Sequence, residues 1–423
     1  MTAETHRTID AVWRIESARL IAALTRIVRD VGLAEELAQD ALVAALEQWP
    51  EQGIPNNPGA WLMGTAKHRA IDLIRRNKMA QDKYAEIGRD LEQSFAPDHD
   101  AALDDFVGDD LLRLILIACH PVLSREARAA LTLRLLGGLT TDEIARAFVT
   151  PEPTIAQRIV RAKRTLSEAR VPFEVPRGSE LTSRLSSVLE VIYLIFNEGY
   201  SATAGDDLMR PALCEDALRL ARILQGLAPK ESEVHGLAAL LEIQASRLHT
   251  RVDANGDPVL LDKQDRARWD YVLVHRGLAA LERAESFGDA LGPYALQAAI
   301  AGCHARARSV DETDWERIVA LYDALVELTQ SPIVELNRAV AVSRAFGAAE
   351  AMELVDALIE SRVLAGYHLL YAVRGDLYVK LGRDAEARAD FERAAALTRN
   401  MRERDLLLKR ALETISASSA SDA

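Results

Sequence analysis

The sequence predicts an all-α protein with several helical domains, and three observations support that prediction. Alanine and leucine dominate a chain of 423 residues, and only 5% of its residues are aromatic, a composition that favours helices over strands. Apolar residues recur three and four positions apart in one stretch after another, as on the buried face of a helix. Proline and glycine stand between these stretches, where helices end. A chain of this length is expected to form two to four domains.

The formal charge of −13 is spread unevenly along the chain. Residues 111–170 carry about +5, whereas residues 178–423 carry about −10. The three cysteines are far apart and show no disulfide or metal-site spacing, which indicates a reducing compartment. No stretch resembles a signal peptide or is long enough to span a bilayer. We therefore expect a soluble, cytoplasmic protein with no membrane contact, and with one locally basic segment as a candidate for nucleic acid.

The spacing of apolar residues predicts two helices in residues 9–49. The first has apolar residues at helical spacing: Leu20, Leu24, Ile27 and Val31. Gly32 is expected to end it, and the second helix runs from about residue 34 to 48, where Trp49 and Pro50 break it. In the second helix three residues are expected to face inward: Leu37, Ala41 and Ala44. Four polar residues are expected to face outward: Glu35, Glu36, Gln39 and Asp40. Such an acidic face is either solvated surface or a partner site.

The loop from Pro50 leads into a helix that combines an aromatic residue with cations. Asn57 followed by Pro58 is a good helix start. The inward residues of this helix are Leu62, Ala66, Ala70 and Leu73, and its cationic exterior is Lys67, His68, Arg75 and Arg76, with Trp61 near the start. Cations beside a ring suit single-stranded nucleic acid. An ordinary amphipathic helix with a core Trp fits equally well. Residues 79–110 follow as a polar, acidic linker that we expect to be flexible.

A helix-turn-helix pattern occupies residues 139–166. Thr141 is the expected N-cap of its first helix, ahead of the acids Asp142 and Glu143. Pro151 cannot continue that helix, and Pro153 suits the start of the next one. The second helix turns Ile155, Ile159 and Ala162 inward and presents a polar face: Thr154, Gln157, Arg158, Arg161, Lys163 and Arg164. Amides and cations on such a helix read base edges and neutralise phosphates. A helical hairpin with a solvated basic face remains the alternative.

The order of these parts resembles the extracytoplasmic-function subfamily of the sigma-70 factors of RNA polymerase. Residues 34–40 and 61–76 look like the family's region 2, and the helix-turn-helix looks like its region 4. Val149 and Thr150 depart from the glycine and the apolar residue common at the turn. The resemblance implies that Glu35, Glu36, Gln39 and Asp40 dock on core polymerase. It implies that seven residues bind the −10 element: Asn56, Asn57, Trp61, Lys67, His68, Arg75 and Arg76. The polar face of the second helix would read the −35 element.

In sigma factors the segment equivalent to the acidic linker approaches the RNA exit channel, so its charge would mimic nucleic acid. A solvated tether is an equal alternative. The resemblance thus implies a region 2 domain at 9–78, a linker at 79–110 and a region 4 domain at 111–171.

A different composition begins after the Pro- and Gly-rich hinge at 171–178. Helical spacing recurs through residues 178–290, where Asn255-Gly256 is typical of a tight turn and allows one small β-hairpin. Residues 291–415 contain tetratricopeptide-like repeats. The best repeat carries alternating small and aromatic residues: Tyr371, Gly375, Tyr378, Gly382, Ala387, Phe391 and Ala394. Such arrays usually bind a protein or peptide, although a helical cap without a partner fits as well. Residues 416–423 are expected to be disordered.

These observations predict a sigma factor with a regulatory helical-repeat extension. We expect core RNA polymerase and promoter DNA as its partners, with no cofactor, metal site or catalytic residues. A helix-turn-helix regulator that uses the repeats as a scaffold and does not engage core polymerase is the alternative. An enzyme is the third possibility, and the sequence contains no phosphate loop, nucleophile elbow or His-Glu-x-x-His motif that would favour it.

Overall fold

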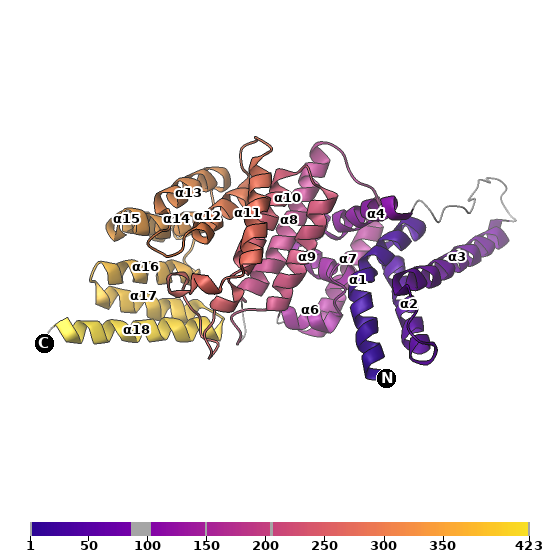
Figure 1. Cartoon of the computed structure of the whole chain (residues 1–423), viewed down its shortest axis with the longest axis horizontal. Coiled ribbons are helices and arrows are strands. Elements are labelled where there is room, and N and C mark those ends of the chain that lie inside the picture. The colour runs from indigo at the N-terminus through magenta and orange to yellow at the C-terminus, as the bar shows by residue number, and fades with distance from the viewer. Residues whose placement is uncertain (1, 86–102, 149, 204–205, 422–423) are drawn as a thin grey trace. The chain divides into compact units, whose positions relative to one another are not determined.

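The computed structural model describes the chain except for residues 1, 86–102, 149, 204–205 and 422–423. The described residues form α-helices and three short 3-10 helices, with no β-strand among them (Figure 1). The prediction of an all-α protein is confirmed. The chain divides into two compact units, residues 1–194 and 195–423, and the division falls within helix α8 (Ser179–Tyr200).

The first unit contains seven complete helices among the described residues. They are α1 (Thr2–Val28), α2 (Val31–Gln52), α3 (Pro58–Ala85), α4 (Leu103–Ala118), α5 (Arg125–Leu135), α6 (Thr141–Ala147) and α7 (Glu152–Glu168). Helices α1, α2 and α3 pack on one another, and α4 packs on α1. Helices α5, α6 and α7 form a second group of mutually packed helices.

The boundaries of the first two helices differ from the prediction. Arg29 adopts a left-handed conformation with φ of 56° and separates α1 from α2. Asp30 then caps α2, its side chain accepting a hydrogen bond from the Leu33 amide at 2.8 Å. Gly32 therefore lies inside α2 instead of ending α1. Pro50 also lies inside α2, in its last turn, and the helix ends at Gly53, whose φ of 89° suits glycine.

Two segments predicted to lack structure are partly helical. Helix α3 continues through Ala85 and α4 begins at Leu103, so both ends of the predicted linker at 79–110 are helical, while residues 86–102 lie outside the described residues. Helix α18 (Met401–Ser421) runs through most of the predicted disordered tail. No glycine or proline interrupts residues 401–421, so nothing in the sequence stops the helix there.

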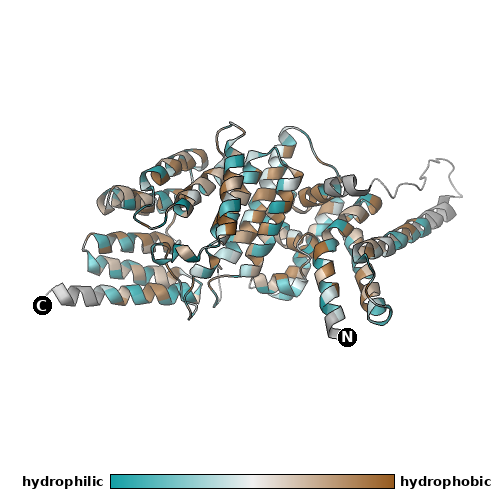
Figure 2. Ribbon diagram, viewed as in Figure 1, coloured by the Kyte–Doolittle hydropathy of each residue, from teal (hydrophilic) through white to brown (hydrophobic). Residues whose placement is uncertain are grey.

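The second unit contains the end of α8 and a succession of further helices. They are α9 (Pro211–Leu227), α10 (Ser232–Ala245), α11 (Tyr271–Glu285), α12 (Pro293–Arg306), α13 (Trp315–Thr329), α14 (Pro332–Ala345), α15 (Ala348–Ser361), α16 (His368–Lys380), α17 (Asp384–Leu397) and α18. From α12 onward each helix packs on the next. Figure 2 shows hydrophobic residues along one side of many of these helices and hydrophilic residues along the other.

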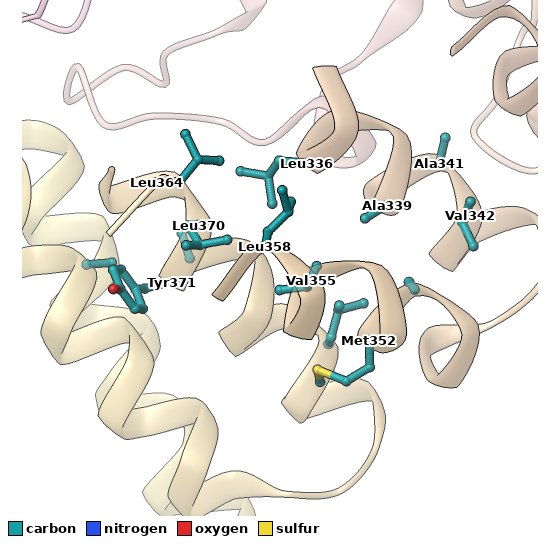
Figure 3. Packing of buried hydrophobic residues seen from close by; sticks show 14 of the residues in the cluster. Leu336, Ala339, Ala341, Val342, Met352, Val355, Leu358, Leu364, Leu370 and Tyr371 are labelled. Carbon is teal, nitrogen blue, oxygen red and sulfur yellow. The ribbon is translucent and has the colours of Figure 1, made fainter. Parts of the chain in front are cut away.

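The tetratricopeptide-like pattern is confirmed by the packing of its residues. Phe391 of α17 is 1% exposed, and an added Cβ at Gly375 of α16 would lie 2.7 Å from its ring. Glycine therefore permits the close approach of the two helices. Ala339 of α14 occupies the matching position 36 residues earlier and is fully buried, like Val355 of α15. Figure 3 shows this core continuing from α14 and α15 to Tyr371 of α16.

The predicted small hairpin is reduced to a tight turn. Val252 and Pro258 form an isolated antiparallel bridge, and Gly256 adopts φ of 81° between them. The Gly256 amide donates to the Asp253 carbonyl at 3.1 Å, which closes the turn. On either side of the bridge the Asp253 amide donates to the Asp257 carbonyl at 2.9 Å and the Val259 amide donates to the Arg251 carbonyl at 2.8 Å. Beyond these bonds the chain continues as a loop with short 3-10 helices up to α11.

Candidate nucleic-acid interface

The helix-turn-helix consists of α6 and α7, packed on each other and on α5. Its N-cap is Thr140, not the predicted Thr141. The Thr140 hydroxyl accepts from the Glu143 amide at 3.2 Å, and the Glu143 carboxylate accepts from the Thr140 amide at 2.8 Å, which completes a capping box. After α6 the Thr150 amide donates to the Ala145 carbonyl at 2.9 Å. Val149, the departure from the usual turn glycine, lies outside the described residues.

Helix α7 separates an apolar face from a polar face. Its buried residues are Ile155, Ile159, Ala162 and Leu166. Four of the six predicted DNA-binding residues are exposed: Thr154, Gln157, Arg161 and Arg164. At 100° per residue these four lie within one quadrant of the helix. Arg164 also pairs with Glu168 one turn later, at 2.6 Å, within this exposed surface. The polar face predicted from sequence therefore exists over most of its length.

A hollow of about 350 Å³ lies alongside this face. It is lined by residues of α7 together with the N-terminal end of α5: Val122, Leu123, Ser124, Ala127, Thr154, Gln157, Arg158, Arg161, Ala162 and Thr165. Arg158 is half-buried at this edge. Glu126 of α5 has a lowered pKa because its backbone amide and Ser124 hydrogen-bond to the carboxylate, with a smaller contribution from the charge of Arg158. The hollow thus combines amide, hydroxyl and guanidinium groups at one surface.

Two predicted site residues face each other instead of facing solvent. The Glu35 side chain is only 3% exposed, and it forms ion pairs with Arg134 of α5, at 2.6 Å, and with Lys163 of α7. The prediction that Glu35 and Lys163 point outward is wrong. Lys163 lies about 240° around α7 from Gln157, next to the apolar face. Glu35 lies on the side of α2 that packs against α7, next to the buried residues Val31 and Ala38 around the helix.

Further contacts join the same two groups of helices. Arg14 of α1 pairs with Glu143 of α6 at 2.8 Å. Gly138, with φ of 71°, lies against α1, where an added Cβ would meet the Ser17 hydroxyl at 3.1 Å. The acidic face of α2 and the helix-turn-helix therefore belong to one packed unit, and Glu35 is shared between them.

The remaining residues of the predicted acidic face are more accessible. Glu36 and Asp40 are exposed, and Gln39 is half-buried with its amide donating to Glu35 at 2.6 Å. Asp40 pairs with Arg69 of α3 at 3.5 Å in a largely solvated position. Two of the three carboxylates of this face are thus exposed, whereas the third is paired within the unit.

The cationic surface of α3 matches the prediction more closely. His68, Arg75 and Arg76 are exposed and Lys67 is half-buried. Leu73, which was expected inside, is also only half-buried. These residues occupy the part of α3 that follows its buried start at Leu62 and Ala66.

The start of α3 is fixed by a cap and an aromatic pair. The Asn57 side-chain oxygen accepts from the Ala60 amide at 3.1 Å, so this side chain caps the helix, while Asn56 is exposed in the loop before it. Trp61 is half-buried, and its ring meets the buried ring of Trp49 edge-on at 5.4 Å between centroids. Trp61 therefore combines a structural contact with partial access to solvent.

Sequence reasoning did not identify several residues that organise this site. Arg134 and Arg14 are ordinary helical arginines by spacing, and each finds its acid more than ninety positions away. Ser187 and Glu190 of α8 also contact this unit, because Ser187 donates to the Cys119 carbonyl at 2.6 Å and Glu190 pairs with Arg125 at 2.6 Å. No local pattern points to such pairs.

Within the described residues, no cluster of three or more His, Cys, Asp or Glu side chains has the arrangement of a metal site. In the same part of the chain, every helix is too short or too polar to cross a membrane.

Three family profiles match parts of the chain. Sigma-70 region 2 matches residues 14–79, and Sigma-70 region 4 matches residues 113–166. A family of unknown function, DUF6596, matches residues 184–285. The two sigma-70 matches contain the acidic face, most of α3 and nearly all of the helix-turn-helix.

The chain is also similar to individual proteins. The "Uncharacterized protein R00370" of Rhizobium meliloti is 42% identical over 388 residues, which cover 90% of both chains. The "Probable ECF RNA polymerase sigma factor SigI" of Mycobacterium tuberculosis is 28% identical over 178 residues, 40% of this chain and 58% of that protein. The "ECF RNA polymerase sigma factor SigK" of Mycobacterium ulcerans is 28% identical over 35% of this chain and 78% of its own length. The crystal structure of yeast Tom70 aligns with a TM-score of 0.31 and 13% identity over 94% of this chain and 84% of Tom70, values too low to inform fold or function.

Proposed function

The chain belongs to the extracytoplasmic-function subfamily of the sigma-70 factors of RNA polymerase, and we propose how its surfaces divide the work of initiation. The helix-turn-helix reads the −35 element, α3 and the loop before it bind the −10 element, and α2 docks on core polymerase. The observation that supports this division best is the exposed quadrant of α7, in which Thr154, Gln157 and Arg161 lie beside a hollow.

The exposed face of α7 suits major-groove recognition. Gln157 offers an amide that can donate to and accept from an adenine edge, and arginine recognises guanine with two hydrogen bonds. Thr154, at the start of the helix, and Arg164, at its far end, flank these residues on the same face. Lys163 lies outside this quadrant, paired with Glu35. We therefore assign base reading to Gln157 with Arg158, and phosphate contact to Arg161 and Arg164.

Two variants separate base reading from phosphate contact. Gln157→Ala should relax base preference at one or two positions of the −35 element, a loss of roughly 1–3 kcal/mol in discrimination. Arg161→Ala should weaken binding to all sequences and reduce the salt slope by about one. Selection of bound sequences from randomised DNA, followed by salt titration of target and random DNA, measures both effects. Arg388→Ala, an exposed arginine on α17, is the control. Equal losses on target and random DNA for both variants would show that α7 does not read sequence.

The exposed acids of α2 suit contact with the polymerase, and the exposed cations of α3 suit a melted strand. Asp40 and Glu36 point into solvent, and Arg75 and Arg76 are exposed on α3. Cations of this kind neutralise phosphates, while Trp61 and Asn56 offer stacking and hydrogen bonds to an extruded base. We assign core binding to the first pair and −10 binding to the second.

These assignments predict opposite defects in two variants. Asp40→Arg should reduce the affinity for core polymerase, because charge reversal replaces attraction with repulsion, and should spare melting by the complex that still forms. The double variant Arg75→Ala/Arg76→Ala should bind core normally but form fewer open complexes. A core-binding titration and permanganate footprinting on the same proteins measure the split. Asp10→Arg, an exposed reversal on α1, is the control, and a parallel loss in both assays for both variants would overturn the division.

The extension after the hinge is proposed to regulate the factor from within the chain. A tetratricopeptide-like array offers a surface for a protein or peptide. We also propose that the protein acts in the cytoplasm, together with core polymerase. We assign the chain no catalytic chemistry of its own. A helix-turn-helix regulator independent of polymerase is the second candidate. Retention of core polymerase by the immobilised full chain separates the two, because the regulator would retain none.

A further inference from the structure

The loop that contains Leu260 and Leu261 crosses helices of the repeats. Helices α12, α14 and α16, the first helices of three successive hairpins, all line one cavity of about 410 Å³. Leu260 and Leu261 line the same cavity and also a neighbouring one of about 350 Å³. The second cavity is lined by α16 and α18 and by none of the residues of α12 or α14. The loop thus contributes to two hollows of small-molecule size, instead of lying beside one groove for an extended peptide.

The loop is held in place by polar contacts at both ends of this crossing. Arg266 donates to the carbonyl oxygens of His304, at 2.9 Å, and Ala307, at 3.0 Å. Asp262 accepts from Arg344 of α14 at 2.8 Å. The wall that the loop contributes to the larger cavity is therefore fixed to the repeats before any ligand arrives.

Cations outnumber carboxylates around the larger cavity. Its lining includes five cations and three acids: Lys263, Arg266, Arg344, Lys380, Arg410, Asp262, Asp376 and Glu413. Two of these cations pair with lining acids, Arg344 with Asp262 and Arg410 with Asp376. Among the described residues, neither Arg266 nor Lys380 forms an ion pair with a carboxylate. The cavity therefore carries excess positive charge within a unit whose sequence is acidic overall.

Arg266 places one of these charges at a buried position. The residue is 7% exposed and donates to neutral oxygens, including the Thr313 hydroxyl at 3.0 Å. Its Nε atom and the His304 Nδ1 atom have no hydrogen-bond partner among the described residues. Burial, with the nearby charges of Arg247 and Arg266, lowers the pKa of His304 to about 3, so this ring is neutral at pH 7. The charge of Glu312 acts on Arg266 without an ion pair between them. A buried guanidinium that lacks a paired carboxylate is costly, and an anion in the cavity would add to this weak compensation.

Lys380 places the second charge where a ligand can reach it. The residue is exposed, and its ammonium donates to the Ser343 hydroxyl at 2.6 Å. Partial desolvation and the charge of Arg344 lower the pKa of Lys380, although Asp262 opposes this shift. An anion beside Lys380 and Arg344 would be attracted by both.

The remaining walls are apolar. They consist of Leu260, Leu261, Val310, Trp315, Val340, Val373, Leu377 and Val379. We infer that this cavity binds a small amphipathic organic anion, with its carboxylate or phosphate against Lys380 and Arg344 and its apolar body against Leu260, Leu377 and Trp315. This inference does not depend on the roles proposed above for DNA and polymerase, and at this cavity it replaces the peptide proposed for the repeats with a small molecule.

The experiment uses the full chain and two matched dyes. The dye 8-anilinonaphthalene-1-sulfonate carries one negative charge, whereas N-phenyl-1-naphthylamine has the same rings without the sulfonate. Lys380→Met removes the charge and keeps the length of the side chain, and Lys380→Arg restores the charge. We expect the sulfonate to bind at a single site. Lys380→Met should weaken it about tenfold, and Lys380→Arg should retain its affinity within about threefold. Lys380→Met should leave the neutral dye unchanged.

Energy transfer from tryptophan shows where the dye binds. Trp315 lines the cavity, and the Trp269 ring centroid lies 5.6 Å from the guanidinium carbon of Arg266, which also lines it. The double variant Trp315→Phe/Trp269→Phe should therefore remove most of the transfer to the bound sulfonate. Trp13→Phe, in the first unit, should preserve it. Lys409→Met, an exposed lysine on α18 outside the cavity lining, is the matched control for charge. Competition by octanoate and by octyl phosphate then distinguishes the two head groups.

Each outcome decides the inference. A selective loss of affinity for the anionic dye in Lys380→Met, together with loss of transfer in Trp315→Phe/Trp269→Phe, supports it. Equal affinity of the anionic dye for wild type, Lys380→Met and Lys409→Met would overturn it, as would transfer that persists in full without both Trp315 and Trp269. Displacement of the loop by an extended acidic peptide that competes with the dye would overturn the assignment to a small molecule.

Discussion

Ending the chain after Arg177 should abolish promoter-specific transcription, although both segments that match sigma-70 remain. The reason lies in the first half of α8, which belongs to the same unit as the helix-turn-helix. Ser187 accepts from the buried guanidinium of Arg128 in α5, and Glu190 pairs with Arg128 at 3.2 Å and with Arg125 at 2.6 Å. Truncation removes both partners of Arg128 at once, together with the Glu190 partner of Arg125.

The loss of buried partners should destabilise the helix-turn-helix by about 2–3 kcal/mol. A fragment ending at Tyr200 keeps all of α8 and is the matched control. Thermal unfolding followed by circular dichroism, and transcription by core polymerase with each fragment, measure the effect. The fragment ending at Arg177 should melt lower and fail to transcribe. Transcription that rises above that of the full chain would instead mean that the extension inhibits the factor. Equal melting of the two fragments would contradict the structural explanation.

Replacing Glu35 with alanine should cost about 3 kcal/mol of stability in the first unit. Glu35 is 3% exposed, whereas its partners Arg134 and Lys163 are 23% and 21% exposed. Removal of the carboxylate leaves two cations close together with little access to water. The free energy of unfolding, from urea titration of the full chain, measures this cost.

Two variants make the Glu35 prediction specific. Glu36→Ala changes the exposed neighbour and should alter stability by less than about 0.5 kcal/mol. Adding Arg134→Met to Glu35→Ala should recover part of the loss, because it removes one of the unpaired cations. If Glu35→Ala unfolds at the same urea concentration as Glu36→Ala, then Glu35 does not hold α2 to α5 and α7.

Local spacing predicted most of the helices because burial of one face imposes the helical period directly on the sequence. The hairpins from α12 to α17 show this well, since Gly375 and Phe391 are recognisable from residue size alone and do meet in the structure. Helix starts were less accurate. Both Thr140 and Thr141 can cap a helix, and the choice depends on Glu143 lying three residues after the cap.

The orientation of Glu35 could not be predicted from its own helix. By spacing it belongs to the acidic face with Glu36 and Asp40, and charged residues are rarely buried unless paired. Its partners, Arg134 and Lys163, lie 99 and 128 positions further along the chain. Only the packing of α2 against α5 and α7 brings these three together. The cavity beside Lys380 was missed for the same reason, because its lining comes from the loop at Leu260 and from five separate α-helices.

The central claim is that this chain directs core RNA polymerase to promoters through α3 and α7. The most direct test is transcription of sheared genomic DNA by purified core polymerase, with and without the full chain, followed by sequencing of the RNA 5′ ends. The claim predicts new start sites that share two upstream sequence elements, and Gln157→Ala should relax the element farther upstream. Identical start sites with and without the chain, while it still binds DNA, would contradict the claim and favour a regulator that acts independently of polymerase.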